Sequence, residues 1–473
     1  MTQQHQSRPL KPAIILQSKK WLLLMALVAV AFMVLAFGYY VKDNAKSART
    51  IARPAVWGVA TALPDHIVMS VMDNPSTTQS VTWRTDTSVK QALAQNALAD
   101  AAPRFWKNAT EHKAETQVMD ADAITDAGVV SHYHSVTFSG LKPNTTYTYR
   151  VGDGAHWSEW LQFRTAAAQL TPFSFIYMGD VQNNILENFA PLVRQAFKTA
   201  PDARLMLYAG DMINFAHSEQ QWHEWFTAVG WMAATIPQVP VVGNHEYGGY
   251  TQKAHKANNR KLSVQWQPQF TLPRNGPEDL KETAYYFDYQ GVRFVVMNSN
   301  EKLDTQAEWL KQVLKKNTQP WTVVAFHHPV FSGAQHSDNK LLRTLWQPIF
   351  EQYAVDLVLT GHEHTYTRGQ ALLSGKPGGP VYVVSVSGSK MYGFKNNIWD
   401  GYQAQLQRKG ENTQLFQVIT VNSCQLKFKA YTATGELYDA FDLKKDTANK
   451  SSVLYNSVEK TVPERNHRNT IAY

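Results

Sequence analysis

The feature that most constrains this chain is a set of apolar, strand-like runs that each end in a polar side chain able to bind a ligand. The runs include FSFIYM, LMLY, VPVV, WTVVAF and VDLVL, and helix-like stretches such as ILENFAPLVRQAFKTA lie between them. This alternation is typical of an α/β domain with a largely parallel or mixed sheet. The polar residues that follow the runs are Asp180, Asp211, Asn244, His245, His327, His362 and His364. Because ligands bind at the carboxyl ends of strands in such sheets, we expect these side chains to gather at one site.

Glycines accompany four of these strand ends. Gly179, Gly210, Gly243 and Gly361 stand next to the polar residues. Glycine allows the backbone to turn sharply and to approach a ligand closely. A single Asp or His at such a position is commonly a helix cap or a solvated loop residue. Five such ends in one chain favour a functional site instead.

The five strand ends together resemble the calcineurin-like metallophosphoesterases and, within them, the purple acid phosphatases. The blocks of that family read D-x-G, GDxxY, GNH[DE], VxxH and GHxH, and this chain has GDVQ, GDMIN, GNHE, VAFH and GHEH. The resemblance covers the chain from Pro54 to about Lys445, since that family also carries an amino-terminal fibronectin-like domain. It implies an enzyme with two metal ions at the strand ends.

The resemblance also implies which residues hold the ions. Asp180, Asp211 and His364 would hold one ion. The other ion would be held by Asp211, Asn244, His327 and His362. Carboxylate, imidazole and amide oxygen suit Fe, Mn or Zn. A hydroxide that bridges the two ions would attack the phosphorus in line, so the resemblance implies a hydrolase of phosphoric ester bonds.

Two histidines are expected to act on the substrate. By the resemblance, His245 would contact the phosphate or help to protonate the leaving group. His336, in SGAQHSD, stands near the place of another substrate-side histidine, and a solvated loop residue is the alternative. His328 is not counted as a ligand. Tyr366 and Arg368 are expected to orient the loop that carries the last two histidines.

One position departs from the family pattern. The second block of the purple acid phosphatases ends in a tyrosine that binds ferric iron and gives the colour, and Asn214 stands there in this chain. A neutral amide stabilises trivalent iron far less than a phenolate does. We therefore expect no ferric-tyrosinate site, a colourless protein, and two divalent or mixed ions of Fe, Mn or Zn.

The region before the α/β rhythm has strand character. HIVMSVMD, SVTWRT, HYHSVTFSGL, TYTYRVGD and WSEWLQFRT alternate apolar and polar residues between turn residues. Strands at this spacing predict a β-sandwich of about 100 residues, and GLKPNTTYTYRV resembles the tyrosine-corner region of fibronectin type III domains. The intervening segment, residues 90–115, is expected to be an irregular loop. His132 and His134 share one strand face, and packing is the favoured interpretation for both.

The predicted fold class is an α/β domain, in which helices flank a sandwich of two mixed β-sheets. An all-β fibronectin type III-like sandwich and an amino-terminal transmembrane helix precede it. The predicted boundaries are a cytoplasmic tail at 1–20, a transmembrane signal anchor at 21–41, a linker at 42–56, the fibronectin type III-like domain at 57–168, the catalytic domain at 169–445 and a flexible carboxyl-terminal tail at 446–473.

The anchor is predicted from the segment WLLLMALVAVAFMVLAFGYYV, residues 21–41, which carries no charge. A helix of this length spans roughly 30 Å, about the thickness of a bilayer core. A cleaved secretion signal is the alternative, but such signals have shorter apolar cores and a small-residue cleavage site. We expect a single-pass protein whose catalytic domain lies outside the cytoplasm, in the periplasm or the extracellular space.

These observations favour a membrane-anchored, dinuclear metal-dependent phosphoesterase that hydrolyses the phosphate monoester of a small molecule. The alternatives are hydrolysis of phosphodiesters, nucleotides or phospholipid headgroups on the same scaffold, and an inactive surface binding protein. The net charge of +8 includes no dense basic block, so nucleic-acid binding is not expected. EYGGYTQKAHKANNRKLSVQWQPQF and KMYGFKNNIWDGYQ are expected to form pocket walls. No pattern in the sequence predicts an oligomeric state.

Overall fold

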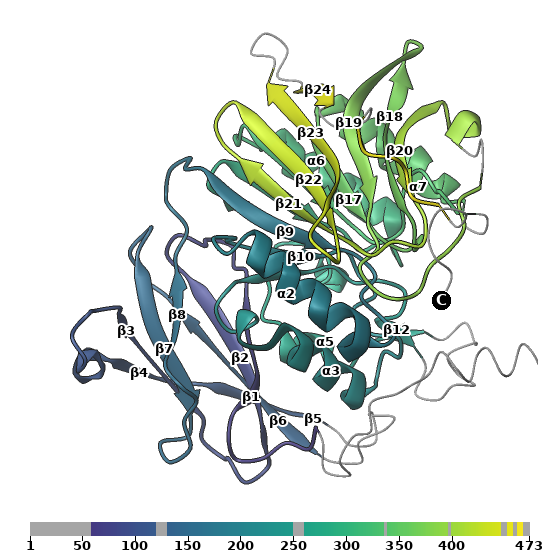
Figure 1. Cartoon of the computed structure of the whole chain (residues 1–473). Coiled ribbons are helices and arrows are strands. Elements are labelled where there is room, and N and C mark those ends of the chain that lie inside the picture. Colours follow the sequence, from purple (N-terminus) through teal and green to yellow (C-terminus); the bar gives the residue numbers. More distant parts are fainter. Residues whose placement is uncertain are drawn as a thin grey trace, which may run out of the picture. The chain divides into compact units, whose positions relative to one another are not determined.

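The computed structural model describes residues 58–119, 130–248, 260–334, 338–395, 399–445, 452–456 and 461–466. These residues form a β-sandwich followed by an α/β domain, as expected (Figure 1). Within these ranges, no helix has both the length and the apolar character needed to cross a bilayer. The predicted cytoplasmic tail, anchor and linker, residues 1–56, lie outside the described residues.

The sandwich is built from two facing layers of strands. Its strands are β1 (Asp65–Ser70), β2 (Gln79–Asp86), β3 (Leu93–Leu98), β4 (Thr110–Lys113), β5 (Glu115–Met119), β6 (Ser131–Phe138), β7 (Thr146–Gly152) and β8 (Leu161–Arg164). One layer contains β1, β2, β6 and β5, and the other contains β4, β3, β7 and β8. Buried side chains such as Trp83, Tyr149 and Phe163 fill the space between the layers. The predicted all-β domain is confirmed.

The segment expected to be an irregular loop, residues 90–115, is partly regular. β3 pairs with both β4 and β7, and a short helical turn, η1 (Phe105–Asn108), connects β3 to β4. Ala94, Asn96 and Ala97 are the buried positions of β3. Alanine and asparagine are poor strand formers, so the sequence LAQNAL gives a weak strand signal. Pairing with neighbouring strands decides its conformation.

The two histidines of β6 pack within the sandwich, as predicted. The ring of His134 lies between two hydroxyls, with Nε2 2.7 Å from Thr85 Oγ1 and Nδ1 2.9 Å from Thr116 Oγ1. His132 Nδ1 donates to the Val89 carbonyl at 2.9 Å. Each ring is therefore satisfied by hydrogen bonds inside its own domain.

The first sheet of the α/β domain continues the sandwich. Its own strands are β9 (Phe173–Met178), β10 (Met206–Tyr208), β11 (Gln238–Pro240), β21 (Leu415–Val421), β22 (Gln425–Thr432), β23 (Leu437–Lys445) and β24 (Ser452–Asn456). β9, β10 and β11 are parallel, and β21 to β24 extend the β9 edge in antiparallel fashion. On the other side, β1 pairs with β11 through Ser70 and Gln238. The sandwich layer and the catalytic sheet thus form one continuous sheet.

The second sheet packs against the first. Its strands are β14 (Tyr285–Tyr289), β15 (Val292–Val296), β16 (Trp321–Ala325), β17 (Leu357–Thr360), β18 (Tyr366–Leu373), β19 (Lys376–Val384) and β20 (Ala404–Gly410). β15, β16, β17 and β19 are parallel, and β14, β18 and β20 are antiparallel to their neighbours. Side chains of both sheets, among them Phe175, Phe294 and Leu359, share one buried core. Two mixed sheets are therefore present, as predicted.

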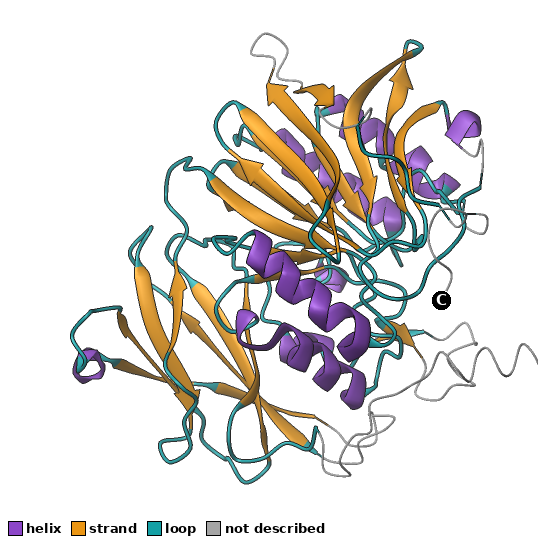
Figure 2. Cartoon of the chain, viewed as in Figure 1, coloured by secondary structure: helices purple, strands orange, loops and turns teal. Residues whose placement is uncertain are grey.

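Helices lie on both sides of the paired sheets (Figure 2). They are α2 (Ala190–Thr199), α3 (Glu219–Val229), α5 (Trp266–Gln269), α6 (Leu303–Lys315), α7 (Lys340–Leu345) and α8 (Gln347–Gln352), with helical turns η3 (Ile185–Phe189), η4 (Gly230–Met232), η5 (Glu278–Leu280) and η6 (Trp399–Tyr402). A short ladder of β12 (Tyr247–Gly248) and β13 (Lys261–Leu262) completes the described elements. α6, α7 and α8 cover the second sheet through a core that contains Leu310, Trp346 and Phe350.

Part of the segment expected to be a flexible tail, residues 446–473, is ordered. β24 pairs with β23 and forms the edge of the first sheet. Farther along, Arg465 Nε donates to Thr413 Oγ1 at 2.8 Å, and the Arg465 backbone N–H donates to the Tyr438 hydroxyl at 3.1 Å. The catalytic domain therefore extends beyond the predicted boundary at residue 445.

Candidate metal centre

Parallel strands of both sheets carry the predicted site residues at their carboxyl ends. In the first sheet, β9, β10 and β11 lead into Asp180, Asp211 and Asn244. In the second sheet, β16 leads into His327, and β17 leads into the loop with His362 and His364. Since the two sheets share a core, these ends lie at one edge of the domain.

Four side-chain atoms of types that bind metal ions meet in a first cluster. Asn244 Oδ1 lies 3.1 Å from His327 Nε2 and 2.8 Å from His362 Nδ1. The same two ring nitrogens are 3.2 Å apart, and Asp211 Oδ1 is 3.3 Å from His327 Nε2. The structure thus brings together the four residues that the family resemblance assigns to one of the two ions.

A second cluster adjoins the first and shares Asp211 with it. His364 Nε2 lies 3.7 Å from Asp180 Oδ1, which is buried without a hydrogen-bond partner among the described residues. Asp211 Oδ2 accepts a hydrogen bond from Gln182 Nε2 at 3.0 Å, and that amide nitrogen is 3.3 Å from His364 Nε2. Asp211 therefore has one oxygen in each cluster, which is the placement expected of a bridging ligand.

Hydrogen bonds on the far side of two rings decide which nitrogen faces the clusters. His327 Nδ1 donates to the Ala209 carbonyl at 2.8 Å, and His364 Nδ1 donates to the Lys390 carbonyl at 2.9 Å. In the neutral form, each ring therefore presents an unprotonated Nε2 to the site. Metal-binding histidines are held and oriented in this way.

The chemistry of the clusters fits cations. Buried acceptor atoms at these separations repel one another unless a proton or a cation lies between them. Burial opposes protonation of His327, but the Asp211 carboxylate outweighs it and raises the pKa of His327 to about 9. Burial, reinforced by Asp211, raises the pKa of Asp180 well above its usual value. Burial lowers the pKa of His362 and of His364 to about 3, so both rings are neutral bases at physiological pH.

The backbone at the strand ends is strained. The φ angles of Asp180, Asp211, His362 and His364 are 50°, 52°, 75° and 47°. Positive φ is uncommon outside glycine, costs on the order of 1–3 kcal/mol per residue and clusters at functional sites. A Cβ atom at Gly243 would lie 2.2 Å from Asp211 Oδ1, so glycine leaves room for that carboxylate. This crowding explains why the sequence places glycine beside the ligands.

Glu246 holds two of the strand ends together. Its Oε2 accepts hydrogen bonds from the backbone N–H groups of Asp211 at 2.9 Å and Gly243 at 2.6 Å, and its Oε1 accepts one from Met212 at 2.7 Å. The side chain is fully buried. Burial, followed by the charge of Asp211, raises the pKa of Glu246 to about 7. This carboxylate therefore fixes the loop after β10 against the loop that carries Asn244.

His245 lies at the border of the clusters. Its backbone N–H donates to Asp211 Oδ1 at 2.9 Å, and its Nδ1 donates to the Asn214 carbonyl at 2.8 Å. The remaining ring nitrogen, Nε2, lies 3.9 Å from Asp211 Oδ2. The other predicted substrate-side histidine, His336, lies outside the described residues.

His328, which the sequence analysis leaves out of the ligand set, contacts the site from the side. Its ring centroid is 4.3 Å from that of His362. Its Nδ1 is 2.9 Å from the Ser299 hydroxyl, so one ring nitrogen has a partner outside the clusters. Burial lowers the pKa of His328 well below its usual value, and the ring is neutral. The geometry gives it a packing contact with one of the converging rings.

Tyr366 and Arg368 follow the loop of His362 and His364 at the start of β18. Both reach a buried carboxylate of β23: the Tyr366 hydroxyl donates to Asp439 Oδ2 at 2.7 Å, and Arg368 Nε donates to the same oxygen at 2.7 Å. These bonds tie the end of the histidine loop to the first sheet. The prediction that the two residues orient this loop agrees with their contacts.

Comparison with known families decides what the chain is related to. Residues 64–165 match the family described as the purple acid phosphatase N-terminal domain, and residues 173–366 match the calcineurin-like phosphoesterases. The chain therefore carries, in this order, a purple acid phosphatase N-terminal domain and a calcineurin-like phosphoesterase domain. Purple acid phosphatase 21 of Arabidopsis thaliana is 28% identical over 273 residues, which are 55% of this chain and 59% of that protein. Purple acid phosphatase 15 of the same plant is 25% identical, over 53% of this chain and 52% of its own length. The chain thus spans between half and two thirds of the length of these relatives.

Solved structures share the fold of this purple acid phosphatase-like chain. The purple acid phosphatase PPD1 from yellow lupin seeds superposes with a TM-score of 0.69 at 18% identity, covering 83% of this chain and 76% of its own. The structure of PhoD superposes with a TM-score of 0.60 at 15% identity, covering 88% of this chain and 96% of its own. At these identities, the likeness concerns the fold.

Three residues at the site of this purple acid phosphatase-like chain are not singled out by the sequence analysis. Gln182 stands where the family block D-x-G has glycine, and that departure is the signal by which it could have been found. Lys390 and Tyr392 lie in the segment expected to form a pocket wall, and they line a cavity of 140 Å³ beside the clusters. The Tyr392 ring centroid is 4.7 Å from that of His364.

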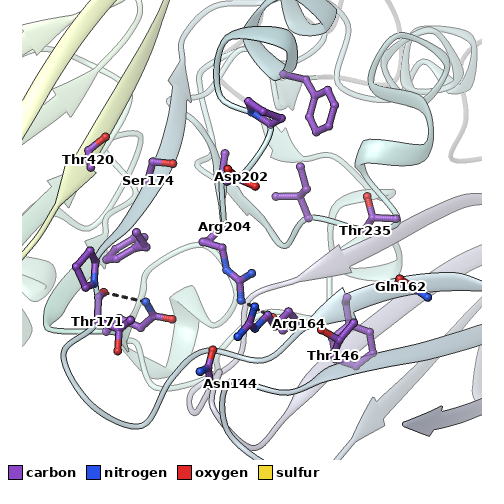
Figure 3. A pocket seen from close by; sticks show the side chains of 18 of the residues that line it. Asn144, Thr146, Gln162, Arg164, Thr171, Ser174, Asp202, Arg204, Thr235 and Thr420 are labelled. Carbon is purple, nitrogen blue, oxygen red and sulfur yellow. Dashed lines mark hydrogen bonds between the residues drawn. The ribbon is translucent and has the colours of Figure 1, made fainter. Parts of the chain in front are cut away.

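A larger cavity, of 780 Å³, lies at the opposite ends of the first-sheet strands (Figure 3). Ser174 at the start of β9 and Arg204 before β10 line it together with Arg164 of β8. Arg204 Nη2 donates to the Arg164 carbonyl at 3.3 Å, which fixes the guanidinium against the sandwich. β9 has 6 residues, so about 20 Å of strand separates this cavity from Asp180. It is therefore distinct from the metal centre.

Proposed function

We propose that this chain is a dinuclear metal-dependent phosphoesterase that hydrolyses phosphate monoesters. The observation that carries the proposal is the convergence of buried acceptor atoms, 2.8–3.7 Å apart, in two clusters that share Asp211. One ion would be held by Asp180, Asp211 and His364, and the other by Asp211, Asn244, His327 and His362. When bound, two such cations activate a water molecule near neutral pH and offset the negative charge of the phosphoryl group.

The residues around the 140 Å³ cavity suit a phosphate ester. The cavity of 140 Å³ is larger than the space that one water molecule needs, so it has room for a phosphoryl group. Lys390 lines it and supplies a positive charge for phosphoryl oxygens. His245 Nε2, at 3.9 Å from Asp211 Oδ2, borders the same space and is placed to give a proton to the leaving oxygen.

Hydrolysis of a diester or nucleotide is the alternative, and one observation favours it. A second cavity, of 560 Å³, also reaches Asn244 and is lined by Arg260 and Lys340. Glu301 and Asp338 also line this cavity, so its charges balance, and its size is what leaves room for the larger leaving group of a diester or nucleotide. Monoester hydrolysis remains the main proposal because residues of both clusters line the 140 Å³ cavity together with Lys390 and His245.

A paired assay tests the proposal. Purified protein is expected to release p-nitrophenol from p-nitrophenyl phosphate, to lose this activity on treatment with a chelator and to regain it with Mn²⁺, Zn²⁺ or Fe²⁺. The bis-ester, bis(p-nitrophenyl) phosphate, is expected to react more slowly, and a faster reaction would favour the diesterase alternative. Equal rates with and without chelator, or no release with any of these metals, would leave the inactive binding protein as the better interpretation.

We also propose that the ions are divalent or mixed and form no ferric-tyrosinate pair. Asn214, which takes the place of the family's tyrosine, accepts a hydrogen bond from His245 through its backbone carbonyl. An absorption spectrum of active protein should show no band in the visible region. A purple protein would contradict this part of the proposal.

The proposed location is a single-pass membrane anchor with the catalytic domain in the periplasm or the extracellular space. Its support is the uncharged segment 21–41 and the usual orientation of a lone first span. Membrane fractionation and protease treatment of intact cells test it. Release of the active protein as a soluble, shortened chain would favour the cleaved signal instead.

Replacing Glu246 with glutamine is expected to lower kcat/KM by about 10–100-fold, the range found when a group that orients metal ligands is lost. A glutamine has a single acceptor oxygen, and its NH₂ group would face backbone N–H donors. Measurements of kcat/KM and of bound metal check this, with Glu278→Gln at an exposed carboxylate as the control. A folded E246Q protein with unchanged metal content and kcat/KM would contradict the positioning role.

A further inference from the structure

We propose that the side-chain oxygen of Gln182 is a further ligand of the ion held by Asp180, Asp211 and His364, and that this ligand set shifts the preference of that ion site toward Mn²⁺. The inference rests on the proposed metal-dependent function and extends it. Its basis is the position of the Gln182 amide inside the second cluster.

Gln182 is fixed in the site by its place in the chain. It lies two residues after Asp180, its side chain is completely buried, and its backbone N–H donates to the Asp211 carbonyl at 3.1 Å. Its amide nitrogen is 3.0 Å from Asp211 Oδ2 and 3.3 Å from His364 Nε2. The amide therefore contacts two of the proposed ligands of this ion.

The two ends of the amide are satisfied unequally. Nε2 donates to Asp211, whereas Oε1 is buried and has no partner among the described residues. A buried polar atom without a partner costs about 1–3 kcal/mol. The polar groups of a buried side chain are normally all paired, so this oxygen needs a partner that the described residues do not supply.

A half-turn of the amide exchanges its nitrogen and its oxygen without changing the shape of the side chain. After the turn, Oε1 faces Asp211 Oδ2 and His364 Nε2. His364 donates through Nδ1 to the Lys390 carbonyl, so its Nε2 is also an acceptor. Three acceptors would then meet, which is favourable when a cation lies among them. The same side chain thus serves as a hydrogen-bond donor without metal and as an oxygen ligand with it.

The resulting ligand sets differ in chemical character. The ion beside Gln182 would receive oxygens from Asp180, Asp211 and Gln182 and one nitrogen, from His364. The other ion would receive two oxygens, from Asp211 and Asn244, and two imidazole nitrogens, from His327 and His362. Carboxylate and carbonyl oxygens suit Mg²⁺ and Mn²⁺, whereas imidazole suits Zn²⁺. The preference for Zn²⁺ over Mn²⁺ should therefore be weaker at the Gln182 ion site than at its neighbour.

Metal titrations of the full-length, metal-stripped protein test this inference. Calorimetric titration with Mn²⁺ is expected to resolve two ions in the wild type. Gln182→Leu should lower the Mn²⁺ affinity of one of the two ion sites by about 10–100-fold. Gln182→Glu keeps an oxygen at this position and should retain the affinity. Gln182→His should raise the Zn²⁺-to-Mn²⁺ affinity ratio of the same ion site.

The matched control is Gln269→Leu. Gln269 on α5 is also buried, and neither its amide oxygen nor its amide nitrogen has a partner among the described residues, so its replacement controls for loss of a buried amide. It should leave both Mn²⁺ affinities unchanged. If metal-stripped Q182L fails to fold, Gln182→Asn, which withdraws the amide by one methylene, provides the same comparison.

The outcomes separate this inference from the proposed function. A wild-type protein that binds neither Mn²⁺ nor Zn²⁺ would overturn the metal-dependent function itself. If the wild type binds two ions and the isotherms of Q182L and Q182N superimpose on its own, only the proposed role of Gln182 would be overturned. A change in the electron paramagnetic resonance spectrum of bound Mn²⁺ in Q182L, absent in Q269L, would support direct coordination.

Discussion

Replacing Asp211 with asparagine is expected to lower kcat/KM for p-nitrophenyl phosphate on the order of 10³-fold or more, because this residue is needed by both ions. Its Oδ1 lies 3.3 Å from His327 Nε2, and its Oδ2 accepts the hydrogen bond from Gln182 at 3.0 Å. Asparagine keeps one oxygen and replaces the other with an NH₂ group, which cannot bind a cation. Steady-state kinetics in excess Mn²⁺, together with the metal content per chain, check the prediction.

The corresponding change at Asp180 separates loss of activity from loss of folding. Burial and Asp211 raise the pKa of Asp180, so the folded chain binds its proton more tightly than the unfolded chain does. In the metal-free protein, Asp180 therefore lowers the free energy of unfolding once the pH rises above the pKa that this residue has in the unfolded chain. Above that pH, the carboxyl group ionises more readily in the unfolded chain than in the folded one. Metal-stripped Asp180→Asn should unfold at the same temperature as metal-stripped wild type or higher at pH 7, and should still be inactive. Asp211→Asn or Asp180→Asn with more than a tenth of wild-type activity would contradict the proposed ligand set.

The site could be predicted from the sequence because its signal is local. A buried parallel strand requires a continuous apolar run, and the residue after the run is fixed at the edge of the sheet. Asp180 and Asp211 each follow such a run, separated from it by a single glycine. The same short pattern thus predicts both the strand and the position of the ligand residue that follows it. Its five occurrences identified six side chains that the structure brings together.

Gln182 and Glu246 show why the remainder of the site was harder to predict. Neither follows a strand directly, and each is defined by contacts with groups from other parts of the chain. Glu246 matches its family block, but its hydrogen bonds to the backbone at Asp211 and Gly243 follow from the meeting of two loops. Gln182 is visible only as a departure from glycine in one block. A pattern of residue types does not state which atoms face one another.

The ordered strand inside the predicted carboxyl-terminal tail was hard to predict for a similar reason. β24 was expected to belong to a flexible tail because its sequence, SVLYN, stands among polar residues. Its conformation depends on pairing with β23 and on the contact of Asn456 with Arg368, a residue far away in the sequence. Likewise, β1 joins the catalytic sheet through a single pair with β11. Strand pairing over such separations is decided by tertiary packing.

The long-range contact with the largest expected effect on stability is the buried pair of Arg368 and Asp439. Both side chains are fully buried, with Arg368 Nε 2.7 Å and Nη2 3.1 Å from the two carboxylate oxygens. The Tyr366 hydroxyl donates to the same carboxylate at 2.7 Å. Arg368 Nη1 donates to Gln407 at 2.8 Å and to Asn456 at 2.9 Å. The network joins β18, which follows the histidine loop, to β23 and β24.

Replacing Asp439 with alanine is expected to lower the free energy of unfolding by about 3–5 kcal/mol, because a buried guanidinium would lose its counter-charge. Urea unfolding of the metal-loaded protein measures this change. The control is Glu308→Ala: Glu308 accepts a hydrogen bond from Lys311 at 2.7 Å, and both side chains are exposed, at 71% and 43%. Since solvent screens that pair, its loss should cost about 1 kcal/mol or less.

The double variant Arg368→Met/Asp439→Leu shows whether the cost comes from the unpaired charge. Replacing both partners with apolar side chains of similar size removes the charge as well as the pair, and such replacements can be nearly neutral. We therefore expect the double variant to lose less stability than the sum of Arg368→Met and Asp439→Leu measured singly. The losses could instead be additive, or the free energy of unfolding of Asp439→Ala could lie within about 1 kcal/mol of the wild-type value. Either result would show that packing holds the two sheets together at this point and that the ion pair contributes little. If the expected result is obtained, the loop that carries His362 and His364 depends on the Asp439 carboxylate, which lies more than seventy residues farther along the chain. The positions of the ligands can then be predicted from a few strand ends, but the contacts that stabilise them cannot be predicted from any local pattern.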